Sequence, residues 1–137
     1  MTEDLYRAVV LEHYKNPANR HPMDDVTGRG YSHNPLCGDE ITIYARVEDG
    51  RLADASFDAR GCSISQASAD MMIDHLRGRG IAEVEATISD FEKLLEDSDA
   101  EPPASLAGVA VLAAVRKFPV RVKCALLPWR TLREAIA

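Results

Sequence analysis

The chain has 137 residues and a net charge of −6, and its hydrophobic fraction of 46% and charged fraction of 28% are typical of one globular domain, expected over residues 1–137. An acidic balance argues against a nucleic-acid partner, because neutralising phosphates needs a basic surface. The longest apolar run, Leu106–Val115, is too short to cross a membrane and no secretory signal is visible, so we expect a cytoplasmic protein without a membrane partner.

The N-terminal third predicts a helix, a loop and a strand. A helix is expected over Glu3–Lys15, and Asn16-Pro17 ends it because the residue before proline avoids the helical region. Its residues at helical spacing are Leu5, Ala8, Val9 and Glu12. A loop follows, and then a weaker strand over Val26–Ser32, which two glycines interrupt.

A strand hairpin comes next. Apolar and polar residues alternate over 41–48 and again over 53–59, with the turn signal Asp49-Gly50 between them. A two-residue loop would place the apolar residues of the two strands on different faces. A three-residue loop over 49–51 pairs Ile43 with Phe57 and Ala45 with Ala55, and we therefore favour it.

The second half predicts helices. One begins at Ser63 as N-cap, and a second covers about Ile81–Glu96 unless it restarts at Ser89. After an acidic connector over residues 96–103, Leu106–Lys117 reads as a buried helix. The last helix is expected to begin just after Cys124, because Pro128 is tolerated only in a first turn. The fold class is therefore α+β, a small antiparallel sheet covered by helices.

Each of the three cysteines is expected at a junction between elements. Cys37 precedes the hairpin, and Cys62 and Cys124 each precede a helix, whose N-terminus favours a thiolate. An odd number of cysteines in a reducing compartment argues against a disulfide framework and leaves metal binding, thiol chemistry or core packing. The junction positions favour a shared thiol or metal function over packing.

A carboxylate would complete a tetrahedral site with three thiolates. Asp39 is the best-placed one, two residues after Cys37. Such a site carries surplus negative charge, so cations are expected to lie beside the bound cofactor, and Arg121 and Lys123 are the candidates. Both also fit an ordinary solvated loop. His33 is a weaker candidate ligand, and no CxxC pair strengthens the metal hypothesis.

Three motifs in order carry a family resemblance. They are Asn34-Pro35-Leu36-Cys37-Gly38-Asp39, Gly61-Cys62-Ser63-Ile64-Ser65 and Val122-Lys123-Cys124. With them, the chain resembles the U-type iron–sulfur cluster assembly proteins, the family of IscU, SufU and the N-terminal part of NifU. It is most similar to the SUF branch, because Lys123 stands where IscU-type scaffolds carry a histidine and the region 81–103 fits the insertion of that branch.

The resemblance implies a metal site at one end of this fold, with one zinc ion on Cys37, Asp39, Cys62 and Cys124. It also implies that Cys37 accepts sulfur, as a persulfide, from a SufS-type cysteine desulfurase and serves the downstream SUF assembly machinery. The protein would then be a zinc-dependent sulfurtransferase partner rather than a stand-alone enzyme. Two alternatives stay open: a scaffold for a transient [2Fe–2S] cluster on the same cysteines, and a binding module whose zinc is purely structural.

Overall fold

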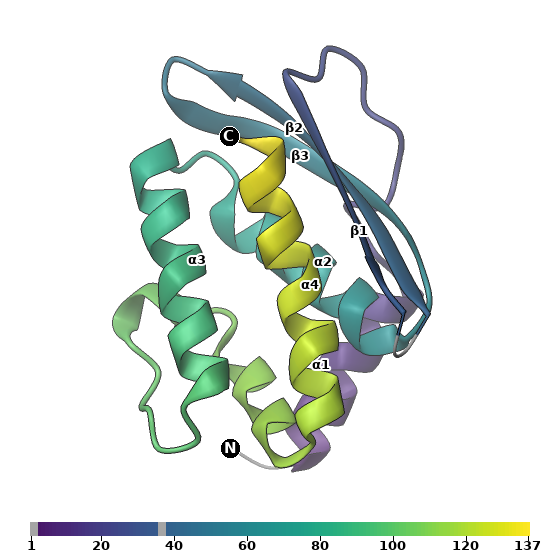
Figure 1. Cartoon of the computed structure of the whole chain (residues 1–137), viewed down its shortest axis with the longest axis vertical. Coiled ribbons are helices and arrows are strands. Elements are labelled where there is room, and N and C mark those ends of the chain that lie inside the picture. Colours follow the sequence, from purple (N-terminus) through teal and green to yellow (C-terminus); the bar gives the residue numbers. More distant parts are fainter. Residues whose placement is uncertain (1–2, 36–37) are drawn as a thin grey trace.

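A computed structural model describes residues 3–35 and 38–137 and contains an antiparallel sheet with helices packed against it (Figure 1). The strands, in the sheet order β1-β2-β3, are β1 (Gly28–Asn34), β2 (Asp39–Glu48) and β3 (Arg51–Arg60). The α-helices are α1 (Glu3–Lys15), α2 (Ser63–Leu76), α3 (Ile81–Glu96) and α4 (Pro119–Ala135). This architecture confirms the predicted α+β class. Within the described ranges, no helix is long and apolar enough to span a bilayer.

The β2–β3 hairpin combines both loop hypotheses. Ile43 pairs with Phe57 as predicted, but Val47 pairs with Leu52, so the turn has two residues rather than three. A register shift after Arg46 reconciles the two pairings, because it leaves one extra residue in β3. A bulge of this kind keeps the apolar side chains of both strands on the core face. The expected three-residue loop is therefore wrong, although the expected pairing is right.

Two glycines of β1 let α4 lie close to the sheet. A Cβ on Gly28 would sit 1.8 Å from the carbonyl oxygen of Ala135, and one on Gly30 would sit 2.3 Å from that of Thr131. Both distances are far shorter than a carbon–oxygen contact allows. The two glycines therefore serve packing and do not interrupt the strand. The strand begins at Gly28 rather than at the predicted Val26.

Helix α1 has the predicted bounds but a different buried face. Tyr6 and Val10 are buried, whereas Leu5 and Leu11 are each 49% exposed. The residues whose spacing predicts the helix, Leu5 among them, are therefore not its most buried face. Beyond α1, the buried Asn19 donates its side-chain amide to Asp70 of α2 at 3.0 Å, which fixes the loop after α1.

The region before α4 differs from the predicted single helix. This region forms two short 3₁₀ segments, η1 (Ala104–Leu106) and η2 (Ala110–Lys117), on either side of Gly108. Ser105 lies inside η1 and donates to Asp90 at 3.0 Å, so it does not cap a longer helix. A Cβ on Gly108 would lie 3.0 Å from Nδ1 of His75, which shows how closely this segment packs on α2.

Helix α4 begins at Pro119, six residues before the predicted start just after Cys124. Pro119 occupies its first turn, and Pro128 lies inside the helix, where proline removes one backbone hydrogen bond. Packing offsets that cost. Trp129 stacks on Phe91 of α3 with ring centroids 3.9 Å apart, and its indole N–H donates to Ser68 of α2 at 3.0 Å. The expectation that Pro128 marks a helix start is therefore wrong.

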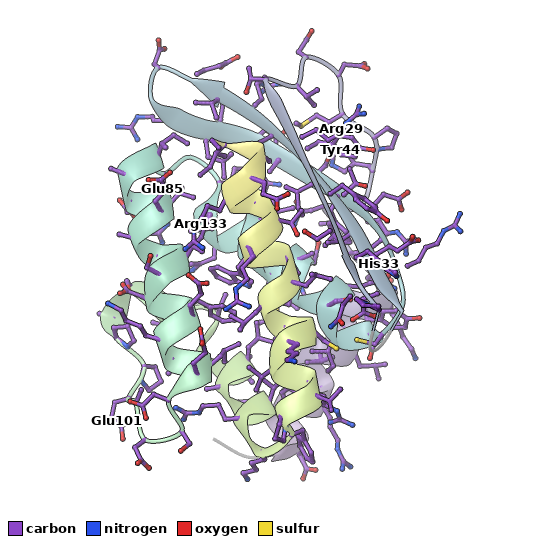
Figure 2. All side chains as sticks on the ribbon, viewed as in Figure 1. Arg29, His33, Tyr44, Glu85, Glu101 and Arg133 are labelled. Atoms are coloured by element: carbon purple, nitrogen blue, oxygen red, sulfur yellow. The ribbon has the colours of Figure 1, made fainter. Side chains whose placement is uncertain are left out.

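Ion pairs also join α3 and α4. Figure 2 labels one of the residues involved, Arg133 of α4. Arg133 donates to Glu92 at 2.6 Å and Arg130 donates to the same carboxylate at 2.9 Å. The hydrogen bond from Arg133 holds the pKa of Glu92 below its ordinary value, despite the opposing effect of burial. Because the folded-state pKa is lowered, the stabilisation is present above the ordinary glutamate pKa and is lost as the pH falls through the folded-state value.

We expect Glu92→Gln to lower the free energy of unfolding at pH 7 by about 1 kcal/mol, since the arginines are partly exposed and screened. The difference from wild type should shrink at acidic pH, where wild-type Glu92 is itself protonated. Urea denaturation at both pH values checks this. Glu96→Gln is the control, because the Glu96 side chain is 56% exposed and pairs with Arg130 alone at 3.2 Å. An equal loss at both pH values would contradict the assignment.

Candidate metal centre

Three elements bring potential metal ligands to one end of the sheet. Asp39 is the first residue of β2, and Cys62 is the N-cap of α2, directly after β3. Cys124 lies in the second turn of α4. A carboxylate oxygen and the two sulfur atoms all lie within 4.8 Å of one another.

Two local expectations at this site are corrected. Ser63 is the first helical residue of α2 rather than its N-cap, and Cys62 occupies the cap position without a side-chain cap hydrogen bond. Cys124 does not precede a helix, since α4 already begins at Pro119. Its thiol instead lies 3.6 Å from the carbonyl oxygen of Val120, one turn earlier. Of the two cysteines that the structure describes, Cys62 is therefore the one at a helix N-terminus.

The Asp39 carboxylate is fully buried beside Cys62. Its Oδ1 accepts the backbone N–H of Cys62 at 2.7 Å, and its Oδ2 lies 3.4 Å from the Cys62 sulfur. A buried carboxylate is unfavourable unless hydrogen bonds or a cation compensate for its lost hydration. The arrangement therefore places a costly anion against two thiols, which suits a site for a positively charged ion.

Gly61 is what allows this approach. Its φ is +117°, and a Cβ there would lie 2.2 Å from Oδ1 of Asp39. A side chain at this position would both strain the backbone and displace the carboxylate.

We expect Gly61→Ala to lower the free energy of unfolding by about 2–3 kcal/mol and to weaken zinc binding as well. Denaturation and a zinc-competition titration measure the two effects. Gly38→Ala is the matched control, because Gly38 also has a positive φ (+70°) but a Cβ there meets nothing within 4 Å. The Gly38→Ala variant should have a lower free energy of unfolding because of backbone strain, but it should keep its affinity for zinc. Equal zinc affinity in both variants would contradict the role of Gly61.

The donor set fits zinc. Zinc in proteins takes four ligands from sulfur, nitrogen and oxygen, with Zn–S near 2.3 Å, so two sulfurs on one ion lie roughly 3.8 Å apart. The observed spread of 4.8 Å or less is within a small side-chain adjustment of that geometry. Cys37, the predicted further ligand and sulfur acceptor, lies outside the described residues. Zinc binding by the four residues stays a prediction.

The two expected cations and the candidate histidine differ in whether they lie at the site. Arg121 lines a cavity of about 530 Å³ together with Cys62 and Cys124. Lys123 is exposed and is not among the residues that line this cavity, and His33 is exposed near the end of β1 (Figure 2). Neither Lys123 nor His33 belongs to the ligand cluster found among the described residues.

Sequence reasoning missed the part that Tyr6 plays in the structure. Tyr6 lines the same cavity from α1, although the residues at helical spacing that predicted this helix did not include it. The usable signal was an alternative stripe through Tyr6 and Val10, with an aromatic side chain facing the core.

A known protein family matches most of the chain. The model of the NifU-like N-terminal domain matches residues 5–125. The chain belongs to the NifU-like N-terminal domain family. This confirms the resemblance drawn from the three sequence motifs, and it covers every element from α1 to the second turn of α4.

Two members of this family are similar over nearly the whole chain. One is the iron–sulfur cluster assembly scaffold protein IscU of Thermotoga maritima, 36% identical over 96% of this chain and 92% of that protein. The other is the zinc-dependent sulfurtransferase SufU of Bacillus subtilis, 35% identical over 98% of this chain and 91% of that protein. The fold also matches a crystal structure of a proposed iron–sulfur cluster assembly scaffold for the SUF system from Fervidobacterium islandicum, with a TM-score of 0.90, 27% identity and full coverage of both chains.

Proposed function

We propose that this protein acts in iron–sulfur cluster assembly as a zinc-bound sulfur acceptor, which takes persulfide sulfur from a SufS-type cysteine desulfurase. The observation that carries the proposal is the meeting of Asp39, Cys62 and Cys124 beside a cavity. A purely structural zinc site would hold inaccessible, unreactive thiols, whereas the cavity beside Cys62 and Cys124 leaves room for a reacting group. The Bacillus subtilis relative named as a zinc-dependent sulfurtransferase supports the same function.

Cys37 completes the proposed ligand set as a third thiolate, with Arg121 as a nearby cation. Zinc, when bound, keeps its thiol ligands deprotonated and shielded from oxidation. Asp39 is a hard oxygen ligand among soft sulfurs, and its N–H hydrogen bond from Cys62 holds it in place. Lys123 remains a proposed second cation at the edge of the site.

The chemistry that the residues perform is a thiolate–persulfide exchange. The Cys37 thiolate attacks the outer sulfur of the partner's persulfide, and a new sulfur–sulfur bond forms on Cys37. The bond within the partner's persulfide breaks, and its electron pair leaves with the partner's cysteine as a thiolate. No net oxidation occurs, so the step needs no other reactant.

The Thermotoga maritima relative, named as a cluster assembly scaffold, favours a second candidate function in which the same cysteines hold a transient [2Fe–2S] cluster as cargo. The two functions differ in a direct test with the zinc-loaded protein, its desulfurase and cysteine. A sulfur acceptor raises desulfurase turnover and keeps its zinc. A scaffold, supplied with iron as well, loses zinc and gains visible charge-transfer absorption. The second result would overturn the first proposal.

A further inference from the structure

The cavity beside the thiols is much larger than a metal ion requires. Its volume is about 530 Å³, and its walls come from α1, the start of α2 and the start of α4. One water molecule in liquid occupies only about 30 Å³, and a zinc ion held by side chains needs no such space. The cavity therefore leaves room for reacting atoms next to Cys62 and Cys124.

The charged side chains that line this cavity are cationic. Among the described lining residues they are Arg7 and Arg121, and no carboxylate is present. Arg121 also lies over the ring of Phe118, with 4.5 Å from its guanidinium carbon to the ring centroid, which restrains the guanidinium. The wall that Arg7 and Arg121 form therefore carries positive charge, next to the thiols and the buried Asp39 carboxylate.

The N-terminus of α2 opens on the same cavity. Ser63 and Ile64, the first two residues of this 14-residue helix, both line it. The N-cap residue Cys62 makes no side-chain hydrogen bond to the first turn, and its own backbone N–H is bound by the Asp39 carboxylate at 2.7 Å. Backbone N–H groups at a helix start, together with the helix dipole, attract negative charge.

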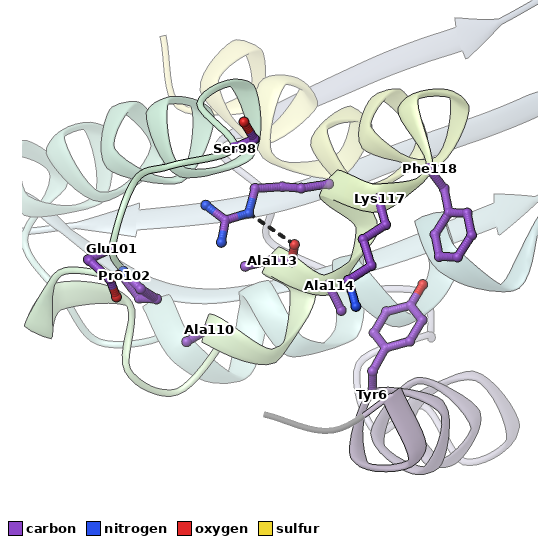
Figure 3. A pocket seen from close by; sticks show the side chains of 10 residues that line it. Tyr6, Ser98, Glu101, Pro102, Ala110, Ala113, Ala114, Lys117 and Phe118 are labelled. Carbon is purple, nitrogen blue, oxygen red and sulfur yellow. Dashed lines mark hydrogen bonds between the residues drawn. The ribbon is translucent and has the colours of Figure 1, made fainter.

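Tyr6 supplies the independent observation. Its side chain is buried, with 4% of the residue exposed, and its hydroxyl makes no well-aligned hydrogen bond to the residues that the structure describes, although the side chain of Arg121 lies close enough to act on it. An unpaired buried hydroxyl is unfavourable, so a partner is expected in the working state. Tyr6 also borders a second cavity, where Figure 3 shows its oxygen turned toward the segment with Lys117 and Phe118.

Charges near Tyr6 connect it with the thiols. Burial raises the pKa of the Tyr6 phenol, so the group keeps its proton at neutral pH and can donate it in a hydrogen bond. The positive charge of Arg121 and a hydrogen-bonding contact with its side chain lower that pKa, and negative charge on Cys62 and Cys124 raises it. The phenol therefore lies within electrostatic reach of both the cation and the sulfurs.

We propose that Tyr6, Arg121 and the first turn of α2 form a subsite for the terminal, negatively charged sulfur of an incoming persulfide. The inference rests on the proposed function and adds the residues that receive the donor. Two sulfur anions must meet in the exchange, and they repel each other. A hydrogen bond from the Tyr6 hydroxyl and the charge of Arg121 withdraw negative charge from the terminal sulfur, which makes it a better target for the attacking thiolate.

The test uses the zinc-loaded full chain with cysteine persulfide as the sulfur donor, and mass spectrometry follows single-turnover sulfur uptake. Tyr6→Phe and Arg121→Gln should each raise the half-saturating persulfide concentration about tenfold, with zinc content unchanged. The controls are Tyr14→Phe, on the same helix but 39% exposed, and Arg29→Gln, whose guanidinium lies over Tyr44 on the sheet (Figure 2). Both controls should match wild type.

A second measurement separates a binding role from a structural one. Because Tyr6→Phe removes an unpaired buried oxygen, the metal-free variant should melt at or above the wild-type temperature. Unchanged half-saturation in Tyr6→Phe, or a lowered melting temperature with normal sulfur uptake, would overturn the subsite. If wild type itself takes up no sulfur, the proposed function fails and the subsite fails with it. If wild type takes up sulfur and Tyr6→Phe does so equally, only the subsite fails.

Discussion

Removing zinc from the loaded protein is expected to lower its melting temperature by about 10 °C or more. The reason is that Asp39, Cys62 and Cys124 come from β2, α2 and α4, so one ion joins elements that are distant in the sequence. Binding free energy at such a site is also folding free energy, because the unfolded chain does not hold the ligands together. Thermal denaturation with and without a strong chelator measures the shift.

Cys124→Ser is the control for this prediction. It removes one sulfur ligand and should weaken zinc binding by more than about a hundredfold, since even the loss of a residue that only orients a ligand costs 10- to 100-fold. Its melting temperature should then be low and insensitive to the chelator. A wild-type melting curve that stays the same after verified zinc removal would contradict the linkage. Full zinc occupancy in Cys124→Ser would remove Cys124 from the site.

The second large effect is expected at Cys37. Cys37→Ser should fail to take up sulfur and fail to raise desulfurase turnover, because serine cannot form a persulfide. The sequence places Cys37 between Pro35 and Gly38, and Gly38 has a φ of +70°. Proline and glycine beside a cysteine are typical of loops, and loops often carry functional side chains. Desulfurase turnover with each variant is the measurement.

Asp39→Ala is the informative contrast to Cys37→Ser. It removes a ligand and lowers metal retention, but it leaves the accepting thiol in place, so part of the sulfur transfer should survive. A Cys37→Ser protein that stimulates the desulfurase as well as wild type does would show that another residue accepts the sulfur.

The hairpin and the helices α1 and α3 could be predicted from the sequence, because their apolar side chains recur with the period of a strand or of a helix. Ile43 pairs with Phe57 as expected, since a slip by one residue would have moved every apolar side chain to the wrong face. The bulge near Arg46 could not be predicted. A two-residue turn and the pairing of Ile43 with Phe57 are compatible only when β3 contains one extra residue, and no local pattern shows that residue.

The start of α4 could not be predicted from local rules. An internal proline argues against a continuous helix, but the stacking of Trp129 on Phe91 and the hydrogen bond from Trp129 to Ser68 stabilise it. These contacts join segments far apart in the sequence, so no local pattern reports them. The same error placed Cys124 at a helix start.

At the site, residue chemistry indicated that Asp39, Cys62 and Cys124 belong together, and the structure places their ligand atoms within 4.8 Å. The surroundings were harder to predict. Of the two cations expected there, only Arg121 lines the cavity, and Tyr6 reaches it from a helix that was predicted from other residues. Ligand identity depends on chemistry that a sequence displays, whereas a cavity wall depends on how distant elements pack.

The central claim is that this site accepts sulfur, and the most direct measurement is the position of that sulfur after transfer. Zinc-loaded protein is incubated with its desulfurase and cysteine, and peptide mass spectrometry then locates the added sulfur. We expect one added sulfur atom, chiefly on Cys37, with zinc still bound to the protein. Sulfur that accumulates on Cys62 or Cys124 instead, or no added sulfur on any cysteine, would contradict the account.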